Sequence, residues 1–72
     1  MAIVTSFWKQ VDEDCAKVLH EKFDTDREAR EFFNSAVIYY TSCAKEYEFV
    51  EIFCKANGRV FNFNFVNGDM EE

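Results

Sequence analysis

The stretch YEFVEIFCKANGRVFNFNFV, residues 47–66, decides the fold. Asn57-Gly58 lies between two apolar runs, and this dipeptide is the strongest short-range signal for a hairpin because both residues tolerate positive φ. A two-residue loop fixes the strand register, so we expect Ala56 to face Arg59. Alternation along both strands then places six apolar side chains on one face: Val50, Ile52, Cys54, Phe61, Phe63 and Phe65. We predict that this face is the core side of the sheet.

The same register predicts a second, outer face of the hairpin. We expect this face to remain uncovered, because two helices of ordinary length cannot cover both sides of a small sheet. The predicted result is an exposed apolar patch with an acidic rim, the patch made of Phe49, Phe53, Ile38, Val60 and Val66 and the rim of Glu46, Glu48 and Glu51. Patches of this kind often mark partner or dimer sites. The alternative is that a helix or the tail folds over it.

The residues before the hairpin show helical patterns. Thr5 and Ser6 are suitable N-cap residues for a first helix. The apolar side chains that follow fall at helical spacing and predict one stripe over residues 7–23: Phe7, Trp8, Val11, Cys15, Val18, Leu19 and Phe23. Thr25 followed by Glu28 forms a capping box that predicts the start of a second helix, and Asn34-Ser35 is a plausible stop.

Residues 36–43 fit two interpretations. Their apolar spacing would continue the second helix, whereas the β-branched and aromatic residues 37–41 favour a strand. We take the strand, joined to the hairpin by a tight turn at Ala44-Lys45. The predicted fold is therefore α+β, with two N-terminal helices packed on one face of a three-stranded antiparallel meander. We expect one compact domain over residues 1–72, with a frayed acidic tail over 67–72.

Charge restricts the partners that this chain suits. Fourteen acidic residues against eight basic ones give a formal net charge of −6, which disfavours direct binding of nucleic acid and favours a protein partner with a basic surface. No stretch is apolar and long enough for a membrane span, and the first residues do not form a signal peptide. Three widely spaced cysteines fit a reducing compartment, so we expect a cytoplasmic protein.

Motifs for chemistry are missing from the sequence. We expect no cofactor and no metal, because the acidic runs 12–14 and 24–26 do not continue into a calcium loop. His20 is the only histidine, and Cys15 on the same predicted helix would point away from it. Cys43 is the cysteine expected to be exposed, and it would need an unseen contact with His20 to act as a nucleophile. We therefore predict that the protein is not an enzyme.

Three functions remain open. The leading hypothesis is a small acidic protein-binding module that occupies a partner surface, in its most specific version as an inhibitor of a nucleic-acid-handling enzyme. In style the chain resembles the small acidic inhibitors of phages and mobile elements, including nucleic-acid mimics and anti-CRISPR proteins, although no motif carries this likeness. The alternative is a homodimeric structural or accessory subunit that assembles through the outer sheet face. A second alternative is a small Cys-dependent enzyme.

Overall fold

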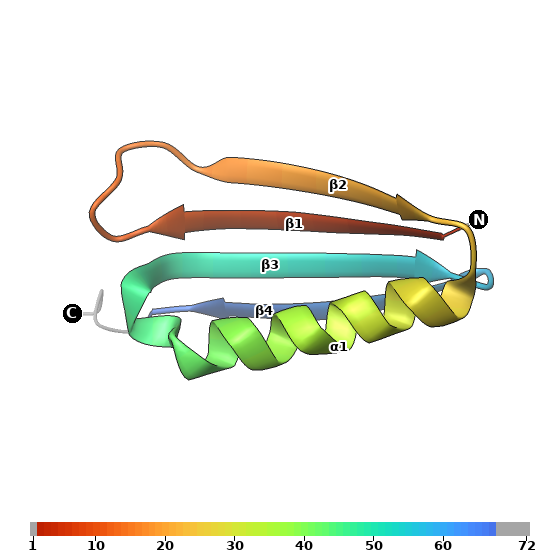
Figure 1. Ribbon diagram of the computed structural model, residues 1–72. Coiled ribbons are helices and arrows are strands. Elements are labelled where there is room, and N and C mark those ends of the chain that lie inside the picture. The colour runs from red at the N-terminus through yellow and green to blue at the C-terminus, as the bar shows by residue number, and fades with distance from the viewer. Residues whose placement is uncertain (1, 68–72) are drawn as a thin grey trace.

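The computed structural model describes residues 2–67 of the 72-residue chain. Its elements are β1 (Ala2–Gln10), β2 (Lys17–Phe23), α1 (Asp26–Ser42), a short 3-10 helix η1 (Ala44–Glu46), β3 (Tyr47–Ala56) and β4 (Arg59–Val66). The strands form one antiparallel sheet in the order β2-β1-β3-β4, and α1 lies against one of its faces (Figure 1). The α+β class holds, but the predicted two helices and three strands are wrong.

The hairpin of β3 and β4 has the predicted register. Ala56 pairs with Arg59, and every pair from there to Phe49 and Val66 follows without a shift. The turn residues adopt the left-handed conformation that the dipeptide was expected to supply, with φ of 56° at Asn57 and 74° at Gly58. Because the loop has two residues, the alternation of core and outer side chains follows directly from its position.

Residues 2–23 form two strands, and the predicted first helix over 7–23 is wrong. β1 lies in the middle of the sheet between β2 and β3, and it buries Ala2, Val4 and Ser6 in strict alternation. Phe7 and Trp8, neighbours in the predicted stripe, therefore lie on opposite faces. Pairing with β3 selects the strand, and this pairing joins residues that are far apart in the sequence. The acidic segment 11–16 connects the two strands.

The predicted helix start at Thr25 is confirmed, because Thr25 is the N-cap of α1 and its Oγ1 accepts the N–H of Glu28 at 3.2 Å. The predicted strand at 37–41 is wrong: α1 continues through Asn34-Ser35 to Ser42, and the expected turn at Ala44-Lys45 lies in η1. Ala29, Phe32, Phe33, Ala36 and Tyr40 recur at helical spacing and pack toward the core. Burial of this stripe outweighs the strand preference of residues 37–41.

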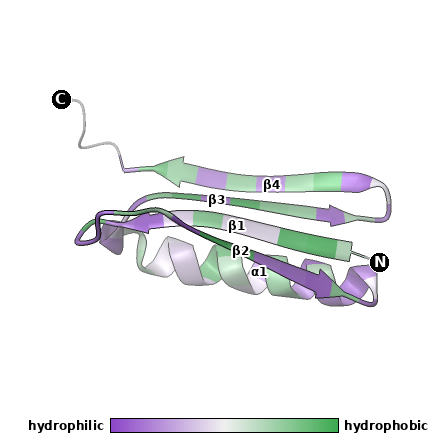
Figure 2. Ribbon diagram, turned by 90° about the horizontal axis from the view of Figure 1, so that it is seen from above, coloured by the Kyte–Doolittle hydropathy of each residue, from purple (hydrophilic) through white to green (hydrophobic). Residues whose placement is uncertain are grey.

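The core lies between α1 and the inner face of the sheet, where the largest fully buried side chains are Val4, Val50, Ile52 and Cys54. α1 packs mainly on β3 and β1, to a lesser extent on β2, and hardly on β4. In the view from above, β4 lies farthest from α1 (Figure 2). The inner side chains of β4 are therefore only half-buried, although the sequence predicted them to be core.

The predicted frayed tail falls partly within the described residues. Asn67 is held on β3, because its N–H donates to the carbonyl of Glu48 at 2.9 Å and its Nδ2 to the carbonyl of Tyr47 at 3.2 Å. Asn67 is therefore part of the hairpin's hydrogen-bonded edge, and the rest of the predicted tail, residues 68–72, lies outside the described part. Within residues 2–67 no helix has the length and apolar character needed to cross a membrane.

Candidate interaction surfaces

The face of the sheet opposite α1 is covered by no described element. It carries a hollow of about 430 Å³ whose lining is almost entirely apolar and comes from three strands: Ile3, Thr5, Phe7, Phe53, Lys55 and Val60. The rings of Phe7 and Phe53 meet edge to face, with their centroids 6.3 Å apart. We call this surface the open face. Its apolar centre is built on the two middle strands, which makes it a rigid platform.

Four of the predicted patch residues lie on the open face. The pairs Phe49–Val66 and Lys55–Val60 follow from the register, and Phe53 pairs with Asn62 beside them. Val60 and Val66 are 62% and 67% exposed. Phe49 and Phe53 are half-buried, and the Phe7 ring packs against the ring of Phe53.

Ile38 does not belong to the open face. It lies on α1, on the other side of the sheet, and it is 70% exposed. Its prediction as a patch residue rested on a strand at 37–41, and it fails because that segment is helical. Ile38 is therefore a surface residue remote from Phe53.

The three predicted rim glutamates lie in different settings. Glu51 is on the open face, between Phe7 and Asn64 in the register. Glu48 Oε2 is 2.9 Å from Lys9 Nζ, so a base partly neutralises its charge. Glu46 ends η1, and its carbonyl accepts the N–H of Val11 at 3.0 Å. The register adds further polar and basic side chains to this face, namely Thr5, Lys9, His20, Lys22 and Lys55, so the open face is apolar with mixed charge.

Sequence reasoning missed Ile3 and Phe7 as members of the open face. Ile3 was predicted to precede the first helix and Phe7 to lie within it, whereas both residues lie on β1. The alternation of Ile3, Thr5, Phe7 and Lys9 with the smaller Ala2, Val4 and Ser6 was a signal for a strand. The helical spacing of Phe7 with Val11 competed with it and was misleading.

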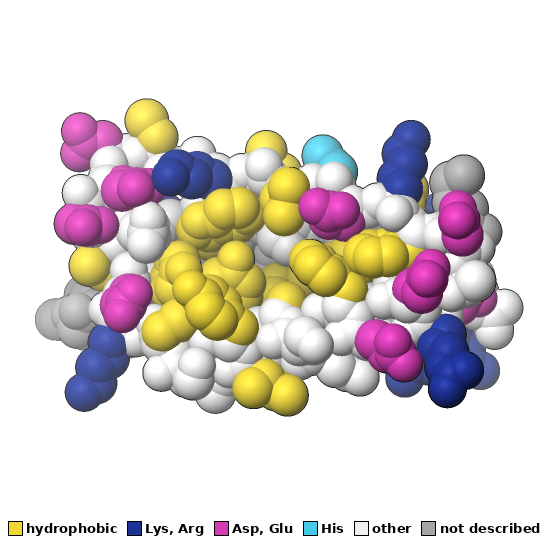
Figure 3. All heavy atoms as spheres, in the orientation of Figure 1, with side chains coloured by type: hydrophobic (Ala, Val, Ile, Leu, Met, Phe, Trp, Pro, Cys, Tyr) yellow, Lys and Arg dark blue, Asp and Glu magenta, His cyan; other side chains and the backbone are white. Residues whose placement is uncertain are grey.

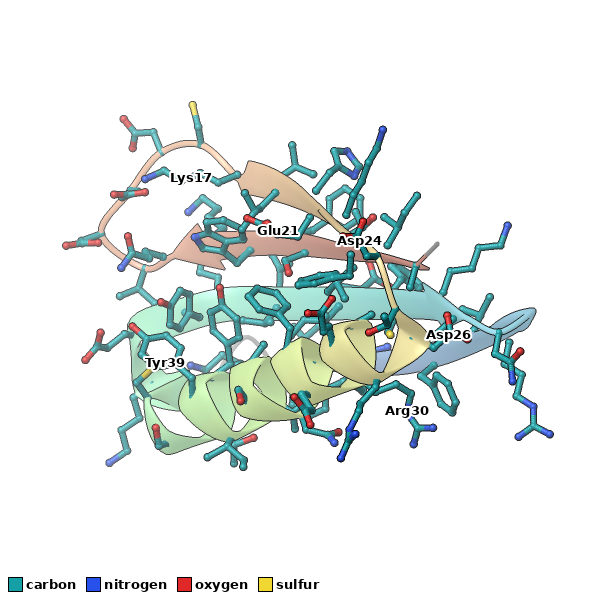
Figure 4. The ribbon with its side chains drawn as sticks, turned by 45° about the vertical axis from the view of Figure 1, so that its right-hand side comes forward. Lys17, Glu21, Asp24, Asp26, Arg30 and Tyr39 are labelled. Atoms are coloured by element: carbon teal, nitrogen blue, oxygen red, sulfur yellow. The ribbon has the colours of Figure 1, made fainter. Side chains whose placement is uncertain are left out.

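A second surface lies between β2 and α1. The rings of Phe23 and Phe32 are 5.3 Å apart and floor a hollow of about 440 Å³ that also contacts Asp24, Glu28 and Glu31. Figure 3 shows apolar side chains gathered on this side of the molecule with acidic groups around them. Figure 4 shows Glu21 and Asp24 on the β2 side of α1, whereas Arg30 projects from the opposite side. Asp24, Glu28 and Glu31 thus lie together on the side of α1 that faces β2.

An aromatic cluster closes the other end of this surface. Tyr40 contacts Trp8 with ring centroids 6.4 Å apart, Tyr39 at 5.2 Å and Tyr47 at 5.1 Å. Burial raises the pKa of Tyr47 well above its usual range, and the hydrogen bond with the Tyr39 side chain acts in the same direction. Burial also raises the pKa of Tyr40. Both rings therefore serve as uncharged packing groups.

The cysteines and the histidine do not converge. Cys54 is fully buried, and burial raises the pKa of its thiol. Cys43 follows α1, and its Sγ donates to the Tyr39 carbonyl at 3.1 Å. Cys15 is exposed in the β1–β2 connection and not on a buried helical stripe as predicted. His20 lies on the outer face of β2, with Nδ1 3.1 Å from Thr5 Oγ1, so the sheet separates it from Cys43.

Metal-binding groups do not gather either: within residues 2–67 no three side chains of the ligating types cluster. Comparison of the chain with protein-family models, with curated proteins and with solved structures finds no match.

Proposed function

We propose that this chain is a protein-binding module that occupies a partner's surface with its open face. The observation that carries the proposal is the apolar hollow around Phe7 and Phe53, on a sheet face that no described element covers. Contiguous apolar patches on small proteins commonly mark interaction sites. The function needs no catalytic step, because steric occupation of the partner suffices.

Two features suit the open face to this role. Interface energy concentrates in a few aromatic and other large side chains near the centre of a patch, surrounded by polar neighbours that exclude water. The Phe7–Phe53 pair has this central place, and Thr5, Lys55 and Glu51 surround it. Because both rings stand on middle strands, binding would order little additional structure and lose little entropy.

The net charge of −6 favours a partner with a basic surface. A basic groove that normally holds nucleic acid is the most specific such surface, and blocking it would make the chain an inhibitor of a nucleic-acid-handling enzyme. In this version the net charge of the whole chain favours the encounter with the basic surface, whereas the apolar centre of the open face makes the contact. Steering and contact can be separated by experiment, because a change of charge acts mainly on the association rate, whereas a change at Phe7 or Phe53 acts on the strength of the complex.

The test compares three tagged proteins in affinity capture and in binding kinetics with the captured partner. These are the wild type, the double variant Phe7→Thr with Phe53→Thr, and the control Ile38→Ser. We expect the double variant to bind at least about 30-fold more weakly, the loss typical of a central aromatic pair. Threonine keeps the strand preference, so circular dichroism should show an intact fold. Ile38→Ser should bind as the wild type does.

Four outcomes would contradict the proposal. The first is equal binding by the wild type and the double variant. The second is unfolding of the double variant, which would assign both rings to the core. The third is self-association that requires Phe7 and Phe53 while no other protein is captured, which would favour the homodimeric subunit. The fourth comes from a further variant measured in the same way, Glu48→Gln with Glu51→Gln: if it alone fails to bind, recognition is electrostatic and the apolar contact is not its basis.

A further inference from the structure

β4 is an edge strand whose outward backbone groups have no partner within residues 2–67. The residues that flank a two-residue hairpin loop exchange hydrogen bonds, so Arg59, Phe61, Phe63 and Phe65 bond to β3. The alternate residues Val60, Asn62, Asn64 and Val66 therefore direct their N–H and C=O groups to the free edge. This edge can accept one further antiparallel strand.

The two edges of the sheet differ in their protection. Natural proteins protect an exposed edge with charges, proline or a bulge. β2 follows this rule with Lys17, His20, Glu21 and Lys22. β4 carries no charge from residue 60 to 66, contains no proline, and keeps an unshifted register along its length. Thus β2 is protected, whereas β4, at the opposite edge of the sheet, is not. This difference indicates that β4 is covered when the protein works.

The inner side of β4 is also incompletely covered. Phe61, Phe63 and Phe65 are half-buried, because α1 packs over the other three strands. A hollow of about 410 Å³ lies where β4 meets the end of α1, lined by Thr41, Ala44, Lys45, Phe63, Phe65, Val66 and Asn67. At the other end of the row, Arg30 stacks on the Phe61 ring at 4.5 Å. Rings placed beside this row would gain aromatic contacts.

The sequence of β4 is symmetric about Phe63. Residues 60–66 read VFNFNFV, which is the same in both directions. When two such strands pair antiparallel with Phe63 opposite Phe63, valine meets valine, phenylalanine meets phenylalanine and asparagine meets asparagine. The edge-facing residues Asn62 and Asn64 then fall opposite each other in hydrogen-bonded positions. Backbone pairing and side-chain faces are therefore both satisfied in one register.

We propose that two copies of this chain form a closed dimer by antiparallel pairing of their β4 strands about a two-fold axis at Phe63. The pairing makes one continuous eight-stranded sheet with both helices on the same side. A second copy is the occupant because the interface of a two-fold dimer must be self-complementary, as this strand is. Although each chain carries a net charge of −6, its paired residues 60–66 place no like charges opposite each other. The dimer leaves both open faces free.

Two matched variants test the register. Both contain Asn64→Lys, which in each chain pairs with Glu51, and they differ only at Asn62. With Asn62→Glu, each lysine faces a glutamate of the other copy. With Asn62→Lys, each lysine faces a lysine. Both positions are exposed on the outer side of β4, so each chain should keep its fold.

Sedimentation over a wide range of concentration measures the assembly. We expect the wild type and the Glu/Lys variant to be dimers, and the Lys/Lys variant to dissociate about tenfold or more readily, in a manner that added salt reduces. The Lys/Lys variant changes the net charge from −6 to −4, which lowers the overall repulsion between copies. Its dissociation must therefore arise at the strand.

Other results would overturn the dimer. These results are a wild-type protein that stays at the monomer mass of 8.5 kDa, the growth of filaments in place of a closed dimer, or equal dissociation of the two variants. A dimer that survives the Lys/Lys change but separates in Phe7→Thr with Phe53→Thr would lie on the open face. Partner capture by the open face is measured separately, so either proposal can fail alone.

Discussion

Ile52 and Ile38 place the same side chain in opposite environments. Ile52 lies on the inner face of β3 at 0% exposure, whereas Ile38 lies on the outer side of α1 at 70% exposure. Burial removes apolar area from water, and truncation of a buried side chain leaves a cavity that the surrounding structure fills only in part. The environment of each isoleucine, and not its type, therefore sets its contribution to stability.

The isoleucine pair gives a matched test of the core. Ile52→Ala should lower the free energy of unfolding by about 2–5 kcal/mol. Ile38→Ala should change it by less than about 0.5 kcal/mol, since it removes exposed surface and alanine favours the helix. Urea denaturation followed by circular dichroism measures both. Equal losses would show that α1 does not cover the sheet as described.

Tyr47 links stability to alkaline pH. Its pKa is raised in the folded protein by burial, whereas the unfolded chain ionises near the ordinary value of 10. The folded state therefore holds its proton more tightly, and the stabilisation is complete below pH 10 and falls as the pH rises above it. Stability should be nearly constant from pH 7 to about 9 and decline beyond 10. Tyr47→Phe should reduce the slope of that decline, and an unchanged slope would contradict the assignment.

The hairpin and the helix cap are the elements that local sequence predicts well. Asn57-Gly58 acts through backbone conformation, and Thr25 with Glu28 acts through a hydrogen bond three residues away. Both signals are complete within a few residues. β1 and β2 are different, because their partners lie outside any local window. The apolar residues of this segment fall at helical spacing by coincidence. The pairing of β1 with β3, and of β2 with β1, determines that they form strands.

The helix cap can be tested by itself. Thr25→Ala removes the acceptor for the Glu28 N–H and should lower the free energy of unfolding by about 0.5–2 kcal/mol. Thr41→Ala makes the same chemical change near the end of α1, where no capping bond depends on it. This control should cost less than about 0.5 kcal/mol in thermal or urea unfolding. Similar losses would mean that the cap does not hold the start of α1.

At the scale of the whole molecule, the open face was predictable only in part. Phe49, Phe53, Val60 and Val66 follow from the hairpin register, which a two-residue turn determines. Placing Ile3 and Phe7 required knowledge that β1 lies beside β3, and Ile38 was misplaced because residues 37–41 belong to α1 and not to the predicted strand. The gathering of acidic side chains on the side of α1 that faces β2 likewise emerges only from the assembled fold.

The order of strands in the sheet has a consequence for how the chain is made. β1 ends at Gln10, but the strand beside it ends at Ala56, which is 46 residues later. At ordinary rates of translation the ribosome needs about 2–9 s to add those residues. Until β3 is complete, part of the nascent β1 has no residue on its β3 side to pair with. The growing chain therefore passes through a stage at which Val4 and Trp8 are accessible to chaperones and to neighbouring nascent chains.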